Sequence, residues 1–178
     1  MIYRFRIVSP DEDQFYREID IRKDSSFLDF HEAIQKSADY DMTQITSFFL
    51  VEDGWKKGME ITMMDMESNS LVMSEVNLDY LIKKVKDRLI YVFDFFSDRA
   101  FYIELKEILS PEPKKKYPQC VLSKGLAPKQ IMVVDVSIND ILDQDLDAIY
   151  GEETRSNEDL DDYNLFTNIE DAPEPEDI

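Results

Sequence analysis

The amino-acid sequence predicts an α+β fold: a single domain with a mostly antiparallel sheet built around a central hairpin, two or three packing helices and an acidic C-terminal tail. The hairpin lies in residues 88–109, where two segments rich in aromatic and branched residues, 89–96 and 100–109, flank the polar break at 97–99. The second segment alternates apolar and polar residues, as a strand with one buried face does. The first is apolar on both faces except at Asp94, so we expect both of its faces to be covered.

Length and composition favour one well-packed domain in the cytoplasm. The chain has 178 residues, of which 43% are hydrophobic and 12% aromatic. No segment is apolar over the length of a membrane span, and the first ten residues alternate instead of forming a signal-type block. The single cysteine, Cys120, cannot form an internal disulfide, which fits a reducing compartment. We therefore predict a cytoplasmic protein without membrane association.

The N-terminal segment predicts a hairpin followed by a helix. Residues 2–8 and 15–21 alternate in hydropathy and are joined by an acidic turn that contains proline. Residues 27–38 predict a helix that either Ser25 or Ser26 can cap. Its apolar stripe consists of Phe27, Phe30, His31, Ile34 and Ala38.

The middle of the chain predicts two further strands and a second helix. Residues 47–51 form a short apolar segment, and residues 57–64 are a plausible return strand. Residues 69–76 give no clear prediction. Asn77 is a suitable cap for a helix over residues 78–85, whose buried side would carry two leucines, an isoleucine and a valine.

The C-terminal part divides into a final strand and helix and an acidic tail. Residues 111–118 form a stiff basic loop with three prolines, and residues 131–136 are a strand candidate. We predict that a helix begins at Ser137, which has capping-box spacing to Asp140. We therefore place the domain at residues 1–150 and a flexible acidic tail at 151–178.

The charge of the chain is concentrated at its C-terminal end. The formal net charge is −19, of which residues 137–178 contribute −14 (15 acids, one base) and residues 1–136 contribute −5 (24 acids, 19 bases). This charge disfavours direct binding to nucleic acid or anionic lipid and favours a basic protein partner, although the tail can equally serve solubility alone. Lys114, Lys115 and Lys116 are either solvated or an anion site.

The residues that common catalytic and metal sites require are missing. The four glycines are isolated, which excludes a phosphate-binding loop, and one histidine with one cysteine cannot build a zinc site of nitrogen and sulfur ligands. A calcium-loop-like segment at 143–154 has Ala148 and Thr154 where glycine and glutamate are required. A Cys120–His31 nucleophile pair is formally available, but His31 lies on an apolar stripe, which favours a core histidine. We predict no cofactor, no metal and no catalytic residue.

Asp94 is the acid that stands out, because it interrupts an otherwise apolar strand. A carboxylate there must be hydrogen-bonded or lie at a sheet end, and the sequence favours a structural role over a functional one. If a pocket exists, we expect it beside the central hairpin. Its candidate lining residues are Tyr40, Asp41, Phe93, Asp94 and Asp98.

Four motifs resemble the plasmid pRiA ORF-three-like family, whose members occur on plasmids, near transposons and in bacterial chromosomes. They are the LDFH segment at 28–31, the YxFDF pattern at 91–95, the IEL triplet at 103–105 and YPQC at 117–120. The likeness covers residues 3–128. It implies an α+β domain with an antiparallel sheet, and no established biochemical activity.

The chain departs from the family pattern at two polar stretches. The family follows its first helix with tryptophan, aspartate and a histidine-containing stretch, whereas residues 40–46 contain no histidine. After the aspartate-containing strand the family has a glycine-aspartate turn, then tryptophan and histidine, whereas residues 96–101 are FSDRAF. The double glycine after the family's cysteine region is also missing. If those residues form a site in relatives, this chain has kept the scaffold and lost much of the site.

The sequence leaves three hypotheses of function. The favoured one is a non-catalytic protein-interaction module that engages a basic partner through its acidic C-terminal arm. The alternative is a ligand-binding or enzymatic domain with a pocket beside the central hairpin. The third, a mobile-element-associated accessory protein that touches DNA, derives only from where relatives occur, and the acidic charge argues against it.

Overall fold

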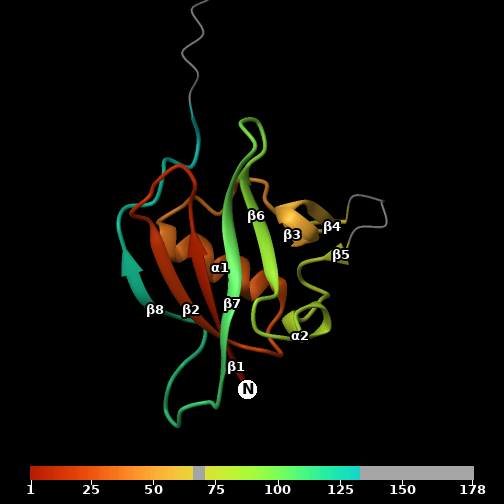
Figure 1. Ribbon diagram of the computed structural model, residues 1–178, viewed down its shortest axis with the longest axis vertical. Coiled ribbons are helices and arrows are strands. Elements are labelled where there is room, and N and C mark those ends of the chain that lie inside the picture. The colour runs from red at the N-terminus through yellow and green to blue at the C-terminus, as the bar shows by residue number, and fades with distance from the viewer. Residues whose placement is uncertain (66–70, 133–178) are drawn as a thin grey trace, which may run out of the picture. The chain divides into compact units, whose positions relative to one another are not determined.

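The computed structural model describes residues 1–65 and 71–132, which form an eight-stranded sheet with two α-helices (Figure 1). The strand order is β5-β4-β3-β6-β7-β1-β2-β8, and β4–β5 is the parallel pair in an otherwise antiparallel sheet. The predicted antiparallel sheet around a central hairpin is therefore confirmed. The strands are β1 (Ile2–Val8), β2 (Tyr16–Arg22), β3 (Ser47–Val51), β4 (Lys57–Thr62), β5 (Leu71–Val72), β6 (Arg88–Asp94), β7 (Arg99–Leu109) and β8 (Gln119–Lys124).

The helix α1 (Phe27–Ala38) packs on one face of the sheet, behind the strands in Figure 1. Its predicted bounds are confirmed, and Ser26 rather than Ser25 is the cap. The Ser26 hydroxyl accepts a hydrogen bond from the backbone N–H of Asp29, and the Asp29 carboxylate accepts one from the backbone N–H of Ser26. This reciprocal capping box fixes the start of the helix, and Asp39 in a left-handed conformation (φ 57°) ends it.

The core lies between α1 and the inner face of the sheet, and it is strongly aromatic. Phe30 stacks on Phe48 with ring centroids 5.6 Å apart, and Phe48 lies 4.8 Å from Tyr91 on β6. The ring centroids of Phe5 on β1 and Phe30 are 4.5 Å apart. These contacts join the N-terminal hairpin, the helix and the central hairpin into one interior.

The second face of β6 is covered by neighbouring side chains instead of a second layer of helices. Ile90 and Val92 are buried there together with Ala100. The partly buried side chains that shield them are Phe49, Val51, Trp55 and Tyr102. Trp55 comes from the short 3-10 helix η1 (Asp53–Trp55) in the β3–β4 turn and lies edge-on to Tyr102 at 4.9 Å. The expectation that both faces of this strand are covered is confirmed.

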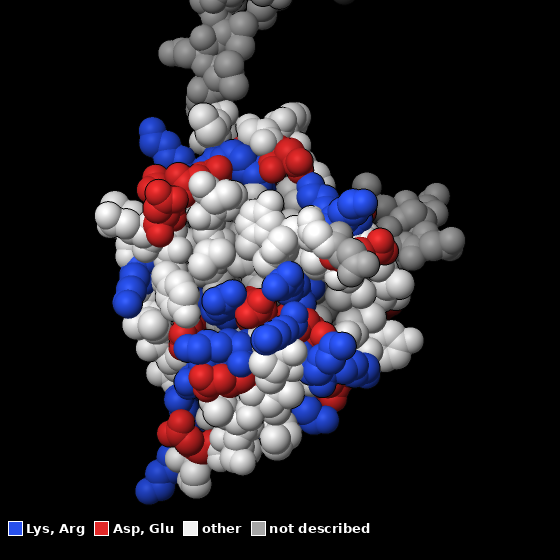
Figure 2. All heavy atoms as spheres, viewed as in Figure 1, with Lys and Arg blue, Asp and Glu red and all other residues white. Residues whose placement is uncertain are grey.

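The rest of this outer face carries charges of alternating sign on adjacent strands. The register places Glu18 opposite Arg6, Arg6 opposite Glu104, and Glu104 opposite Arg88. Ion pairs of 3.3 Å and 3.2 Å join Glu104 to Arg6 and to Arg88. Figure 2 shows the result, in which acidic and basic side chains are intermixed across the middle of the sheet. This face of the described residues therefore carries charges of both signs.

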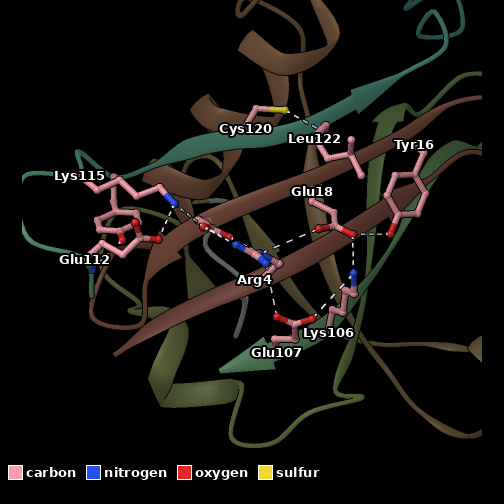
Figure 3. Close-up of polar contacts among 11 residues, drawn as sticks. Arg4, Tyr16, Glu18, Lys106, Glu107, Glu112, Lys115, Cys120 and Leu122 are labelled. Carbon is pink, nitrogen blue, oxygen red and sulfur yellow. Dashed lines mark hydrogen bonds and ion pairs between the residues drawn. The ribbon is translucent and has the colours of Figure 1, made fainter. Parts of the chain in front are cut away.

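Arg4 is the centre of a second charged row on β1. Its guanidinium donates hydrogen bonds of 2.7 Å and 2.9 Å to the two oxygens of the Asp20 carboxylate and lies 3.4 Å from Glu107 (Figure 3). Glu18 is buried beside it and is bound by Lys106 at 2.7 Å. The hydrogen bonds from Lys106 and Tyr16 lower the pKa of Glu18 against the opposing effect of its burial.

One sequence-based prediction needs correction, and one strand was missed. The second helix, α2, covers Leu78–Leu81 and not residues 78–85. It ends early because the Asp87 carboxylate accepts hydrogen bonds from the backbone N–H groups of Lys83 and Lys84, which turns the chain toward β6. The strand β8 was not predicted. Its six residues form the edge of the sheet, where little apolar periodicity is needed.

Residue 133 and those after it lie outside the described residues. The predicted strand at 131–136 falls on them beyond its first two residues, as do the predicted helix from Ser137 and the acidic tail. None of the helices in the described part of the chain has the length and apolar character that a membrane span requires.

Candidate functional site

A pocket of about 600 Å³ opens where β6 runs into the β6–β7 turn, and we call it the hairpin-end pocket. It is bounded by the segment entering β3, the end of β4, the end of β6 and the last described residues. Its lining residues are Gln44, Ile45, Thr46, Ser47, Glu60, Thr62, Met63, Met64, Phe93, Asp94, Phe95, Phe96 and Ile131. The lining is predominantly apolar, with hydroxyl groups and two carboxylates among it.

Asp94 shapes this pocket through the backbone of the hairpin turn. Its Oδ1 accepts hydrogen bonds from the backbone N–H groups of Phe96 (3.1 Å) and Ser97 (3.3 Å). The turn is completed by Asp98 in a left-handed conformation (φ 48°), which aspartate tolerates better than most residues. The carboxylate therefore holds the aromatic tip of the hairpin, where Phe96 is fully exposed.

The second oxygen of Asp94 is buried and lies 3.8 Å from the Arg99 guanidinium, without a hydrogen bond from any described residue. Arg99 also pairs with Asp11 at 2.9 Å and donates to the backbone oxygen of Lys129 at 2.6 Å. Its guanidinium lies 5.2 Å from the centre of the Phe93 ring. Asp94 thus lies beside an arginine that joins the hairpin turn to two other loops.

The five predicted pocket residues occupy different positions. Phe93 and Asp94 line the pocket. Tyr40 packs on Phe93 with ring centroids 5.3 Å apart and donates a hydrogen bond of 2.6 Å to the Pro128 backbone oxygen, and burial raises the pKa of its phenol. Asp41 is exposed, and its backbone is hydrogen-bonded to the Gln130 side chain in both directions. Asp98 is exposed and pairs with Lys57.

A buried polar cluster lies next to the pocket floor. Thr46, which lines the pocket, has its hydroxyl 3.2 Å from Nδ1 of His31, and the same nitrogen is 2.8 Å from the Tyr91 hydroxyl. Gln35 donates from its amide to that hydroxyl, so Tyr91 can donate onward to Nδ1, which places the imidazole proton on Nε2. Nε2 has no hydrogen-bond partner among the described residues. Burial lowers the pKa of His31 to about 4 and keeps the ring neutral.

This cluster is poorly arranged for nucleophilic catalysis. Thr46 is 0% exposed, and a histidine with a pKa of about 4 is a weak base near neutral pH. Cys120 is on β8, where its thiol contacts the Leu122 backbone oxygen, and burial raises its pKa. His31 and Cys120 share no polar contact. Across residues 1–65 and 71–132, no group of three or more histidine, cysteine, aspartate or glutamate residues could hold a metal ion.

Sequence reasoning missed most of the apolar lining. Ile45, Met64 and Ile131 come from three separate segments, and nothing in the spacing of such residues links them. One signal was available, because the apolar run of β6 continues past Asp94 into Phe95 and Phe96. Aromatic residues that persist into a turn are exposed unless another segment covers them.

Comparison with known proteins identifies the family and the fold. The family model described as "Plasmid pRiA4b ORF-3-like protein" matches residues 2–132. No curated protein matches the chain. A solved structure, a protein of unknown function named MM3350 from Methanosarcina mazei Go1, is similar with a TM-score of 0.61 and 23% identity over 71% of each chain, which supports the fold alone. Because the family model matches most of its length, the chain belongs to the plasmid pRiA4b ORF-3-like family.

Proposed function

We propose that this protein is a non-catalytic interaction module whose hairpin-end pocket receives an apolar segment of a protein partner. The observation that carries the proposal is the exposed apolar rim of the pocket. Phe96 is 104% exposed, Ile45 67% and Met64 56%. Contiguous exposure of large apolar side chains is typical of binding surfaces, and aromatic residues are enriched at their centres.

Charge supports a basic partner. The charged residues of the described lining are Glu60 and Asp94, and no lysine or arginine is among them. Residues 137–178 add a net charge of −14, from 15 acids and one base. A partner segment with apolar residues flanked by lysine or arginine would therefore match both the pocket and the acidic arm.

The test is capture of partners from the native cell with the full-length chain and two matched variants. Phe96→Asp places a charge on the pocket rim, and Leu126→Asp places one on another exposed apolar side chain (87%) outside the pocket lining. We expect a specific partner to be lost with Phe96→Asp and retained with Leu126→Asp. Retention by both variants would remove the pocket from the interaction.

The contribution of the acidic arm is tested by a chain that ends after Tyr150. We expect this chain to bind the same partner more weakly, and to lose the salt dependence that an acidic arm confers. Unchanged affinity and unchanged salt dependence would show that the described body alone carries recognition.

A second candidate function is binding of a small apolar molecule in the same pocket. It is favoured by the volume of about 600 Å³, which is within the range of small-molecule sites. Native mass spectrometry of protein purified without denaturation would reveal a bound molecule as a discrete mass increment. That increment should disappear with Phe96→Asp or with Ile45→Asp if the molecule occupies the pocket.

A further inference from the structure

We infer that the outer edge of β8, which no described strand covers, accepts an extended acidic segment of a partner protein as an additional strand. β8 is the last strand in the sheet order and pairs with β2 on one side. None of the described strands pairs with its other side. An edge strand presents backbone N–H and C=O groups that pair readily with another extended chain.

The charge around this edge is opposite to that of the chain as a whole. Residues 113–132 contain five lysines and no acidic residue, whereas the whole chain has a net charge of −19. Lys114, Lys116 and Lys124 are exposed and make no ion pair with any described residue. Lys115 is the exception, because it pairs with Asp20 and Glu112 at the start of β8 (Figure 3). An approaching acidic chain would therefore meet positive charge that no described acidic residue pairs with.

These lysines also restrict which strands can pair. Lysine at a sheet edge discourages association with neutral or basic strands, because pairing would bury or crowd the ammonium groups. An acidic strand meets no such penalty, so the same side chains select the partner by charge. The charges around β8 also restrict where along the strand the partner's acidic residues can lie. The acidic turn with Asp11, Glu12 and Asp13 adjoins the Gly125 end, so the partner's acids belong near the Gln119 end.

The edge is held in place before any partner arrives. The Arg17 guanidinium, which is buried, donates hydrogen bonds to the backbone oxygens of Lys124, Gly125 and Ser37. It thus fastens the end of β8 to the C-terminal turn of α1. Gly125 (φ 64°) lies so close to the Gln14 backbone oxygen that a Cβ there would stand 2.4 Å from it. A rigid edge reduces the ordering that strand addition requires.

The test uses the full-length chain and a fluorescent ten-residue peptide that alternates glutamate and valine. Matched peptides alternate lysine and valine, or carry proline at two glutamate positions. We expect anisotropy to report binding of the acidic peptide alone, weaker at high salt. Hydrogen exchange should slow at backbone amides of residues 119–124 when that peptide is present.

Two charge-reversal variants separate the edge from general electrostatics. Lys114→Glu with Lys116→Glu should weaken peptide binding about tenfold or more. Lys56→Glu with Lys84→Glu makes the same change in net charge at exposed lysines near β3 and α2, and should leave binding within about twofold.

Three results would overturn the inference: no binding of the acidic peptide, equal weakening by both double variants, or binding without slower exchange in β8. A fourth contrary result would come from sedimentation of the full chain combined with hydrogen exchange. If the chain is a dimer in which the β8 amides are protected, and they become exposed on dilution, the edge belongs to a second copy of the chain.

Discussion

His31 is a buried imidazole whose neutral form is the one that fits the core. It is 1% exposed, and burial lowers its pKa from its ordinary value of 6.5 to about 4. Between these values the unfolded chain binds more protons than the folded one, so the free energy of unfolding falls as the pH drops from 6.5 toward 4. We expect His31 to account for about 3 kcal/mol of this loss.

Urea unfolding of the wild type and of His31→Asn between pH 4 and pH 8 checks this expectation. Asparagine can present a polar atom near the position of Nδ1 but does not titrate. The variant should be less stable at pH 8, and the difference should narrow toward pH 4. Glu18 and other acids titrate in both proteins, so parallel curves would mean that His31 is not the titrating group.

Asp94 is expected to act on stability through the hairpin turn. Asp94→Ala removes the acceptor of the Phe96 and Ser97 backbone N–H groups and should lower the free energy of unfolding by about 1–2 kcal/mol. Asp94→Asn keeps an oxygen acceptor and loses only the contact with Arg99, so its effect should be smaller. Chemical denaturation measures both, and a larger effect of asparagine than of alanine would contradict the role assigned to Oδ1.

At the level of secondary-structure elements, the cap of α1 offers a clean comparison. Ser26→Ala removes the hydroxyl that accepts from Asp29, and we expect a loss of about 1 kcal/mol in the free energy of unfolding. Ser25→Ala, one residue earlier, should change it little, because Ser25 is not the cap. Thermal unfolding of both variants decides which serine carries the cap, and equal effects would refute the capping box.

Among the features of the sheet, we expect the charged row on β1 and β2 to make the largest electrostatic contribution to the free energy of unfolding. Arg4→Met leaves Asp20, which is buried, without its bidentate partner and with Lys115 at 3.4 Å as its remaining described ion-pair partner. It should destabilise the protein by about 3 kcal/mol. Adding Asp20→Asn to that variant should restore part of the loss, because the buried carboxylate that has lost its bidentate partner is gone. Denaturant unfolding of the single and double variants measures the coupling, and simple additivity would argue against it.

The elements differ in how well their sequence reveals them. The central hairpin and α1 carry strong periodicities of two and of three to four, and each was predicted close to its observed bounds. β8 has six residues, of which those at both ends are exposed, so its sequence shows no alternation of apolar and polar residues that would predict a strand. The true end of α2 depends on one carboxylate, that of Asp87, which a hydropathy pattern cannot register.

The pocket was even less accessible to sequence reasoning. Phe93 and Asp94 were identified because an acid stood inside an apolar strand. Ile45, Met64 and Ile131 join them only because the sheet order places the β3, β4 and β6 ends side by side. Such long-range proximity is a property of topology, and a single sequence gives no measure of it.

For the molecule as a whole, the two proposals assign partners of opposite charge to two different surfaces. The described body holds an apolar pocket with acids in its lining at one end of β6, and an edge strand, β8, with lysines at its end and in the segments that flank it. A basic partner and an acidic partner would therefore use separate surfaces. Variants at Phe96 and at Lys114 with Lys116 should affect different partners, and competition between the two partners would contradict the separation.

The sheet order also has a consequence for how the protein is made. β1 and β2 leave the ribosome before the other described strands, yet β1 pairs with β7, as in the match of Ile2 with Leu109, and β2 pairs with β8. Until β7 and β8 emerge, the nascent N-terminal hairpin has two open edges. Its folding must be slow and late, because contacts so distant in the chain are costly to close. A nascent chain stalled before β7 should therefore be a substrate for chaperones, and one stalled well beyond β8 should not.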